Sequence, residues 1–464
     1  MKEPAELRAK LLRRRWLVWG MLALSFLIVF FHRIALAVVA DRLMAEFNIT
    51  ASALGNLGAM YFYVYTIMQI PSGLLADTLG PRLTASAGTL VAGIGSVVFG
   101  LAPSFGGALF GRFLVGLGVS VVFISLLKVQ TEWFRAREFA TITGLTSTVG
   151  NSGNALAATP LAVLVAAIGW RLSFVAIGIL GILVAAGCWF FVRNRPEDLG
   201  LPSIKEIEAW EDGTEKSVHR PAQPRRIPFR QALAYIMHSR YTLPLFVSAF
   251  GLNGSLMALS AMWGVPYLMQ VYGLDRAQAS LYTLGTAFGV MLAGPLSGLI
   301  SDRLRRRREP LLSFVALALF AWAALVVWPG RLPLPVLRLV FFLLGLGSGG
   351  YLLVMCLAKE VSPHAIAGIA TGTINTGSFL GAALLQPLVG LVLDATWDGR
   401  LEAGVRLYSL SSYRLGFLFC ALVVALSFMA ALRLPETHAR NIAPDFPFPE
   451  TDRALEPSGS GRTG

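Results

Sequence analysis

An arginine, Arg33, stands inside an apolar stretch near the start of the chain that is long enough to cross a membrane. A charged residue within such a stretch is costly unless it faces a cavity or a partner, so it indicates a functional site. A guanidinium binds carboxylates and comparable anions through paired, charge-assisted hydrogen bonds. Arg33 is therefore predicted to bind the anionic group of a small molecule. The alternative is that it extends to the membrane surface and has a structural role.

Polar and aromatic side chains recur in the other apolar stretches. Tyr61, Tyr65 and Gln69 follow one another at helical spacing and share one helix face, which either lines a cavity or packs in the core. A single polar residue in a membrane helix more often bonds to a neighbouring helix than to a ligand. The cavity-lining residues predicted besides Arg33 are Tyr61, Tyr65, Gln69, Asn151, Asn253, Trp263, Tyr351 and Asn375.

The elements that must position these residues are apolar helices. The chain has 464 residues, of which 55% are hydrophobic and 14% charged, and its mean hydropathy is +0.64. A soluble chain would carry about 25% charged residues. The composition excludes a soluble enzyme, a secreted disulfide-rich protein and a disordered chain, and it predicts an all-α membrane protein. The net charge of +13 is attributed to cytoplasmic loops rather than to nucleic-acid binding.

Twelve apolar stretches are predicted to cross the bilayer, each of them close to the roughly 20 residues that a spanning helix needs. The basic residues before the first stretch lead into a full-length span without a small-residue cleavage site, so no cleaved signal is predicted. The predicted spans are 16–39, 51–71, 84–102, 107–129, 140–166, 171–192, 242–268, 278–300, 310–329, 332–357, 366–392 and 413–432.

Lysine and arginine collect on one side of these spans. With the N-terminus inside, 28 of the 39 fall in cytoplasmic segments, seven in external segments and four within spans. This excess predicts both termini in the cytoplasm and a place in the plasma (inner) membrane. The region around 224–240 is predicted to form an amphipathic helix on the membrane surface. The predicted organisation is a six-helix bundle, a cytoplasmic linker, a second six-helix bundle and a largely disordered cytoplasmic tail, at 1–192, 193–240, 241–433 and 434–464.

The two halves repeat each other. Gly73 and Asp77, after span two, recur 225 residues later as Gly298 and Asp302, after span eight. The two segments read GLLADTLGPR and GLISDRLR. An internal repeat of this kind implies two half-bundles related by an axis along the membrane normal, with a binding site between them.

With these motifs the chain resembles the major facilitator superfamily over essentially its full length. The resemblance implies twelve transmembrane helices in two pseudo-symmetric six-helix bundles. It further implies that Gly73 permits close helix approach, that Asp77 faces the N-terminus of span eleven, and that Arg82 pairs with Glu132. These contacts would close the cytoplasmic side of the molecule. The gating residues so predicted are Gly73, Asp77, Arg82, Glu132, Gly298 and Asp302.

Within the superfamily the chain is most similar to the anion:cation symporters and the organophosphate antiporters. The similarity is carried by 31–33, by Tyr61 and Tyr65, by QIPSGLLADTLGPR at 69–82 and by RNRPEDLGLP at 193–202. It implies that Arg33 binds the anionic group of a substrate. The organophosphate branch carries a second arginine in span seven, and this chain has no basic residue between 240 and 276, which favours a carboxylate over a phosphate ester. Span five lacks the motif of the drug antiporters.

The predicted proton carrier is His32, the one histidine of five that lies within a predicted span. Its ordinary pKa of about 6.5 suits a proton carrier. No Asp or Glu lies in the middle of a span, so either His32 carries the proton or no proton is needed. His32 and Arg33 project about 100° apart and cannot both face one cavity squarely. By the resemblance, Arg112 in span four is linked to proton movement or is structural.

The sequence therefore predicts a secondary active transporter that moves a small organic anion, of the carboxylate or acidic-sugar type, by alternating access and a proton or exchange gradient. The alternatives are a neutral or zwitterionic solute, such as an amino acid or a drug, and a non-transporting membrane sensor. No enzyme activity, cofactor or metal site is predicted, because the chain lacks an ATP-binding motif and its three cysteines lack ligand spacing. The predicted partners are the small molecule and the lipid bilayer, and the chain is predicted to be a monomer that binds no nucleic acid.

Overall fold

The computed structural model describes residues 4–135, 138–211, 229–402 and 405–444, which are almost entirely helical. Two short strands, β1 (Leu401–Glu402) and β2 (Val405–Arg406), pair antiparallel. The helices are α1 (Pro4–Val38), α2 (Ala40–Phe47), α3 (Ala51–Ile67), α4 (Gln69–Thr78), α5 (Pro81–Leu101), α6 (Phe105–Ser120), α7 (Val122–Trp133), α8 (Phe139–Leu156), α9 (Thr159–Phe191), α10 (Ile204–Glu211), α11 (Phe229–His238), α12 (Thr242–Ala258), α13 (Gly264–Tyr272), α14 (Arg276–Leu304), α15 (Arg308–Val327), α16 (Leu334–Gly347), α17 (Gly349–Glu360), α18 (Ala367–Ala395) and α19 (Leu410–Leu432).

Ten helical stretches among the described residues are long and apolar enough to cross a membrane. The predicted spans 51–71 and 140–166 are helical too, but each is interrupted: the first at Met68, between α3 and α4, and the second near 157–158, between α8 and α9. The predicted boundary between spans five and six is a kink inside α9 at Gly169, whose φ is +79°. Only glycine adopts that conformation without strain, so a single residue turns the chain between two helices.

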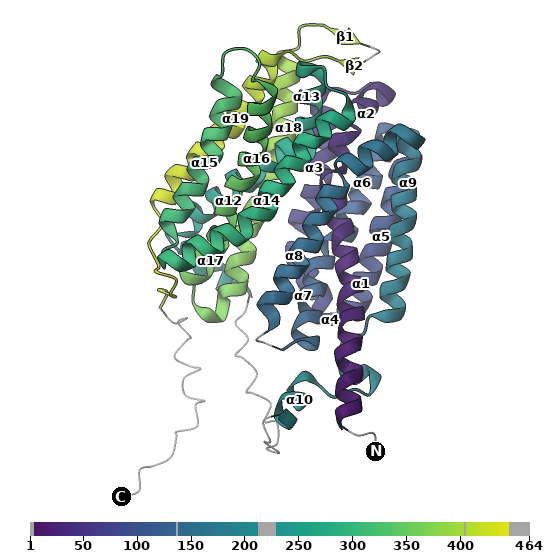
Figure 1. Ribbon diagram of the computed structural model, residues 1–464, viewed down its shortest axis with the longest axis vertical. Coiled ribbons are helices and arrows are strands. Elements are labelled where there is room, and N and C mark those ends of the chain that lie inside the picture. Colours follow the sequence, from purple (N-terminus) through teal and green to yellow (C-terminus); the bar gives the residue numbers. More distant parts are fainter. Residues whose placement is uncertain (1–3, 136–137, 212–228, 403–404, 445–464) are drawn as a thin grey trace, which may run out of the picture.

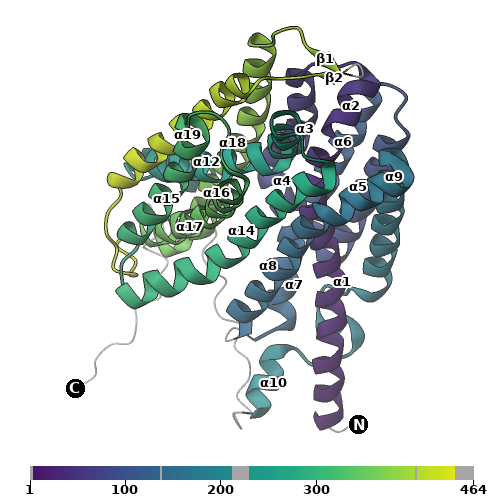
Figure 2. The same cartoon turned by 45° about the horizontal axis from the view of Figure 1, so that its top comes forward.

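The N-terminal helices α1–α9 and the C-terminal helices α12–α19 form two groups that lie side by side (Figure 1). The described chain begins and ends at the same end of the molecule, here called the terminal end, and β1 and β2 lie at the opposite, hairpin end. From its start near α9 at the hairpin end, α14 runs obliquely away from the N-terminal group (Figure 2). The two groups therefore separate toward the terminal end.

The two groups are joined at the hairpin end. There α3 packs against α18 so closely that a Cβ on Gly390 would lie 2.5 Å from the carbonyl oxygen of Ala51. The carboxylate of Asp394 accepts hydrogen bonds from the backbone N–H groups of Ala51 and Ser52, at 3.0 and 2.8 Å. Across the described residues, the hydrogen bonds and ion pairs between the groups lie toward this end, including that of Arg276 with Asp41 at 2.5 Å. The structure is thus closed at the hairpin end.

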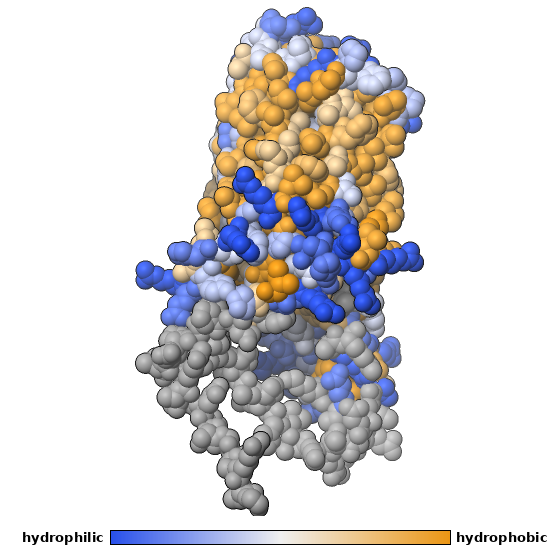
Figure 3. Space-filling model, turned by 90° about the vertical axis from the view of Figure 1, so that its left-hand side faces the viewer, coloured by the Kyte–Doolittle hydropathy of each residue, from blue (hydrophilic) through white to orange (hydrophobic). Residues whose placement is uncertain are grey.

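The surface of the helix groups is apolar. Large side chains such as Phe190, Phe320 and Leu183 are exposed on the outward faces of α9 and α15. Figure 3 shows the apolar surface of the C-terminal group above a band of hydrophilic residues that lies toward the terminal end. Exposed apolar side chains of this extent are expected where a protein meets lipid, so the fold is that of a multi-pass integral membrane protein.

A network of charged residues joins the helix ends of the C-terminal group at the terminal end. Arg307 forms ion pairs with Asp302 at 2.8 Å and with Glu360 at 3.0 Å. Glu436 accepts hydrogen bonds from the backbone N–H groups of Arg307 and Arg308, at 2.7 and 3.0 Å, and so caps the start of α15. Although burial alone would raise the pKa of Glu436, these backbone donors hold it below its ordinary value.

Replacing Glu436 with glutamine is expected to lower the melting temperature at neutral pH, because a capping carboxylate contributes about 0.5–2 kcal/mol to stability. A carboxylate whose pKa is depressed by folding stabilises the protein above its unfolded pKa of about 4.3, and this stabilisation is lost as the pH falls through the folded value. The difference in melting temperature between the two proteins should therefore stay nearly constant from pH 7 to about 5 and narrow as the pH falls further, toward about 3.

Thermal unfolding of both proteins across that pH range checks this expectation. The matched control is Glu402→Gln, which removes an exposed carboxylate at the hairpin end and should leave the melting temperature unchanged. A difference between wild type and Glu436→Gln that stays constant down to about pH 3 would show that the carboxylate charge has no part in the cap.

Candidate functional site

A cavity of about 620 Å³ lies between the two helix groups. Its walls are formed by α1, α3, α7 and α8 of the N-terminal group and by α12, α14, α17 and α18 of the C-terminal group, with the π-helical turn Leu259–Trp263. The predicted residues that line it are Arg33, Tyr65, Asn151, Asn253, Tyr351 and Asn375. The cavity therefore brings together side chains from helices that are far apart in the sequence.

Arg33 is the one charged residue among the described residues that line the cavity. Its guanidinium carbon lies 4.3 Å from the ring centre of Phe30 and 5.5 Å from that of Phe379, and its Nε has no hydrogen-bond partner among the described residues. Both contacts are cation–π interactions, which hold the guanidinium in place without neutralising it. The cavity thus presents a positive charge with no carboxylate beside it.

Uncharged polar groups surround this charge. On the C-terminal side Asn253 donates to Ser378 at 2.7 Å, and the hydroxyl of Tyr351 donates to the amide oxygen of Asn375 at 2.5 Å. On the N-terminal side Asn154 donates to Asn151 at 3.3 Å. These groups offer donors and acceptors to the hydroxyl or carboxyl groups of a ligand, while the aromatic rings supply apolar surface.

An aromatic contact crosses the cavity from one helix group to the other. The rings of Tyr65 on α3 and Phe379 on α18 lie 4.3 Å apart between their centres. Phe379 also contacts Arg33, so the arginine of α1 is positioned by a side chain of the opposite group. A movement of the two groups relative to each other would therefore change the surroundings of the charge.

Three of the predicted cavity residues lie outside the cavity. Tyr61 is fully buried and donates its hydroxyl proton to the carbonyl oxygen of Val29 at 3.2 Å. Trp263 is also buried, and its Nε1–H donates to the backbone carbonyl of Gln386 at 2.9 Å, so it holds α18 rather than a ligand. Gln69 is the first residue of α4, beyond the break at Met68, and it does not line the cavity.

The side chains of His32, on α1, and Arg112, on α6, are buried and do not line the cavity. Arg112 donates to the carbonyl oxygen of His32 at 3.1 Å, and its guanidinium lies 5.5 Å from the ring centre of Tyr61. The ring nitrogens of His32 have no hydrogen-bond partner among the described residues. Arg33 faces the cavity and His32 does not, as the angle between adjacent helical residues requires.

The gating contacts predicted for Gly73 and Arg82 are not formed among the described residues. A Cβ on Gly73 would meet no described atom within 4 Å, as expected where the helix groups are apart at the terminal end. Arg82 donates through Nε to the carbonyl oxygen of Trp189 at 3.0 Å and lies over its ring, so its pair with Glu132, predicted for a closed cytoplasmic side, is not formed in this structure. Glu132 instead lies 4.0 Å from Arg195.

In the C-terminal group the corresponding pair does form. Arg307 stands 225 residues after Arg82, and its ion pairs with Asp302 and Glu360 lie at the ends of α14 and α17. A Cβ on Gly298 would meet no atom within 4 Å, so this glycine makes no close helix contact with a described residue. The side chain of Asp77 lies outside the described part of the structure.

Several cavity residues were not predicted from the sequence. Ser147 and Thr148 line the wall beside Asn151 at spacings of four and three residues on α8, and Phe379 follows Asn375 by one helical turn on α18. Helical spacing from the predicted asparagines therefore indicated these positions. The other polar residues that line the cavity without having been predicted are Ser260, Thr283, Thr286, Ser348 and Ser378.

A bundle of apolar helices around a central polar cavity, with the two helix groups joined at one end, is the architecture expected of a secondary transporter. The sequence matches the family model of the Major Facilitator Superfamily over residues 18–385 and again over 245–454. The chain belongs to this superfamily, which confirms the prediction made from the sequence.

Individual relatives are similar over most of the chain. A probable sulfoacetate transporter of Cupriavidus necator is 27% identical over 397 residues, which cover 83% of this chain and 89% of the relative. The membrane sensor protein UhpC of Salmonella typhimurium is 26% identical over 414 residues, covering 86% and 89%. Among solved structures, a bacterial homologue of the human lysosomal transporter Spinster, in an inward-facing and unoccupied conformation, has the same fold, with a TM-score of 0.69 and 19% identity over 91% of this chain and 98% of that one.

Proposed function

We propose that the chain is a secondary transporter that carries a small organic anion across the membrane by alternating access. The observation that carries this proposal is Arg33, a cation in the central cavity with no carboxylate among the described lining residues. An unneutralised charge inside a membrane protein is costly, and a bound anion would remove that cost. A neutral solute would leave it in place.

The cavity favours a small carboxylate, including an acidic sugar. A single guanidinium matches a single carboxylate with two parallel hydrogen bonds. The amides of Asn151, Asn253 and Asn375 and the hydroxyl of Tyr351 suit the hydroxyl groups of a sugar acid. The relative from Cupriavidus is named for sulfoacetate, which is itself a small organic anion with a carboxylate.

The proposed architecture has twelve spans, in two pseudo-symmetric six-helix bundles at 1–192 and 241–433, with the linker 193–240 between them and the tail 434–464 after them. We place the protein in a bacterial inner membrane as a monomer, with both termini and the linker in the cytoplasm, because basic residues collect at that end. The open terminal end then faces the cytoplasm. Asp77 and Asp302 are proposed to hold that end when it closes. Parts of the linker and tail, 212–228 and 445–464, lie outside the described residues.

The driving gradient is proposed to be that of protons or of a second, exchanged anion. His32 and Arg112 are buried together beside the cavity wall, and protonation of His32 would place a second positive charge next to Arg112. Exchange of one anion for another needs no such step, since the substrate itself neutralises Arg33 in both directions.

Thermal unfolding of the purified protein with single compounds tests the substrate class. A ligand that binds the folded state raises the melting temperature by mass action. Sulfoacetate and galacturonate are expected to raise it, whereas glycine and glucose are not. A shift with glycine or glucose and none with the two carboxylates would show that the solute is zwitterionic or neutral.

A membrane sensor is the second candidate, because one relative is named as a sensor. Uptake of labelled sulfoacetate or galacturonate into vesicles that contain the purified protein separates the two functions. A transporter gives uptake that saturates with concentration and exceeds that of protein-free vesicles. A compound that raises the melting temperature without any such uptake would favour the sensor.

A further inference from the structure

Two arginines meet at the terminal end where α12 begins and α19 ends. The two helices run antiparallel and are held together by Ser427, whose hydroxyl donates to the carbonyl oxygen of Val247 at 3.0 Å. This contact sets the level at which the helix ends lie. Arg240 stands two residues before α12, and Arg433 directly follows α19. Both line one hollow of about 510 Å³.

Neither guanidinium of this pair is neutralised by a described residue. Arg240 donates to the hydroxyl of Tyr241 at 2.6 Å, and the side chain of Arg433 makes no hydrogen bond or ion pair within the described part of the chain. None of the residues that line the hollow is acidic. The nearest acid in the sequence, Glu436, is engaged by backbone N–H groups at the start of α15. The hollow is therefore complementary to an anion.

The wall of the hollow continues into exposed apolar surface. Leu243, which also lines the hollow, is 70% exposed, and Met429, one helical turn before Arg433, is 54% exposed. Figure 3 shows that hydrophilic residues and apolar surface adjoin in this way at the terminal end of the C-terminal group. Paired cations beside exposed apolar side chains match a ligand with an anionic head and hydrocarbon chains. A soluble anion would use the arginines alone.

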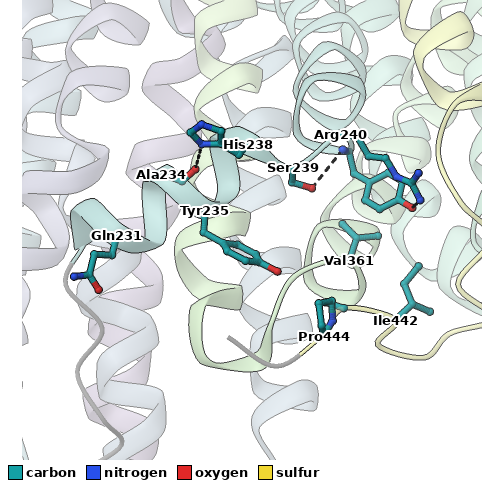
Figure 4. A pocket seen from close by; sticks show the side chains of 11 residues that line it. Gln231, Ala234, Tyr235, His238, Ser239, Arg240, Val361, Ile442 and Pro444 are labelled. Carbon is teal, nitrogen blue, oxygen red and sulfur yellow. Dashed lines mark hydrogen bonds between the residues drawn. The ribbon is translucent and has the colours of Figure 1, made fainter. Parts of the chain in front are cut away.

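The neighbouring helix α11 places this hollow at the membrane boundary. Ala232 and Ile236 pack against Ile366, just before α18, and against Ala370 of α18, while Met237 is exposed. Beneath α11 a second hollow, of about 820 Å³, reaches Arg240 from the other side (Figure 4). The ring of His238 turns back to the carbonyl oxygen of Ala234, 2.7 Å away. An amphipathic helix of this kind lies in the interface between water and lipid.

We propose that Arg240 and Arg433 bind the phosphate of an anionic glycerophospholipid of the surrounding membrane, with the acyl chains against Leu243 and Met429. The lipid joins the ends of α12 and α19 and so stabilises the C-terminal helix group. This site is separate from the central cavity, and it does not depend on which solute the protein carries.

The experiment measures the melting temperature of the full-length protein in a neutral detergent after addition of phosphatidylglycerol, phosphatidylcholine or inorganic phosphate. The variants are Arg240→Gln/Arg433→Gln and, as a control that removes the same charge, Arg331→Gln/Arg400→Gln at exposed positions. Phosphatidylglycerol should raise the melting temperature of wild type and control alike, and the shift in the test variant should fall by about half or more. Phosphatidylcholine and phosphate should have little effect.

Equal shifts in the test variant and the wild type would overturn the proposal, as would a shift with inorganic phosphate as large as that with the lipid. The single variant Arg433→Gln covers the case in which the double variant does not fold, because that side chain bonds to no other described residue. It should also show a reduced shift with phosphatidylglycerol. Native mass spectrometry should then find fewer bound phosphatidylglycerol molecules on Arg433→Gln than on the wild type, and an equal number would contradict the assignment.

Discussion

Replacement of Arg33 with alanine is expected to weaken the binding of sulfoacetate or galacturonate by roughly 30- to 1000-fold, since loss of one partner of a desolvated charge pair costs about 2–4 kcal/mol. The effect is large because Arg33 supplies the one charge among the described residues that line the cavity. Because no other described lining residue is a cation, the negative charge of the anion would have no positive partner in the cavity. Concentration-dependent thermal shifts and vesicle uptake measure the loss.

Arg33→Lys separates charge from geometry. Lysine keeps the positive charge but lacks the planar pair of donors that fits a carboxylate, so an intermediate affinity is expected. The matched control is Arg338→Ala, in which the lost guanidinium lies over the ring of Tyr282, at 5.4 Å, and away from the cavity. Near-normal uptake by Arg33→Ala would show that this arginine has a structural role only. Equal losses in Arg33→Ala and Arg338→Ala would show that any intramembrane arginine is needed for folding.

The helices and the charged centre of the site were predictable, because each stands out against its surroundings. Long apolar stretches can only be helical within a bilayer, where every backbone group must be bonded internally. Arg33 contrasts with the apolar residues around it, and Asn253 and Asn375 do so to a lesser degree. Hydroxyl residues give no such contrast. Ser147, for example, bonds to the carbonyl oxygen of Thr143 in its own helix, at 3.1 Å, and is therefore tolerated at any position of a span.

The direction of a large side chain at a helix irregularity was not predictable from the sequence. Trp263 ends a π-helical turn, Leu259–Trp263, that changes the helical phase, so Ser260 lines the cavity while Trp263 points to α18. The partners of charged residues at the helix ends were equally hidden. The side chain of Arg82 donates to the carbonyl oxygen of Trp189, and its backbone N–H donates to Asn194. Both partners are more than 100 residues away in sequence, so these contacts depend on how α5 and α9 pack.

Replacement of Asp394 with asparagine is expected to shift the molecule toward a state that is open at the hairpin end. Asp394 accepts hydrogen bonds from the N–H groups of Ala51 and Ser52, at the N-terminus of α3, and so joins the two helix groups. Its other partners, Tyr408 and Arg406, belong to its own group. A carboxylate at a helix N-terminus contributes up to about 2 kcal/mol in partly buried sites. Loss of 1–2 kcal/mol would change the ratio of the two states by roughly 5- to 30-fold.

The change is measured by the distance between spin labels on Arg42→Cys and Arg331→Cys, two exposed positions of opposite helix groups near the hairpin end, after Cys188, Cys356 and Cys420 are replaced by alanine. Asp394→Asn should add a population of longer distances. Asp398→Asn is the matched control, because its carboxylate pairs with Arg400 within the same group, at 3.0 Å. If Asp394→Asn and Asp398→Asn both give the wild-type distribution, the contact with α3 does not hold the hairpin end closed. That result would point instead to the other contacts between the groups at that end, such as the ion pair of Arg276 with Asp41.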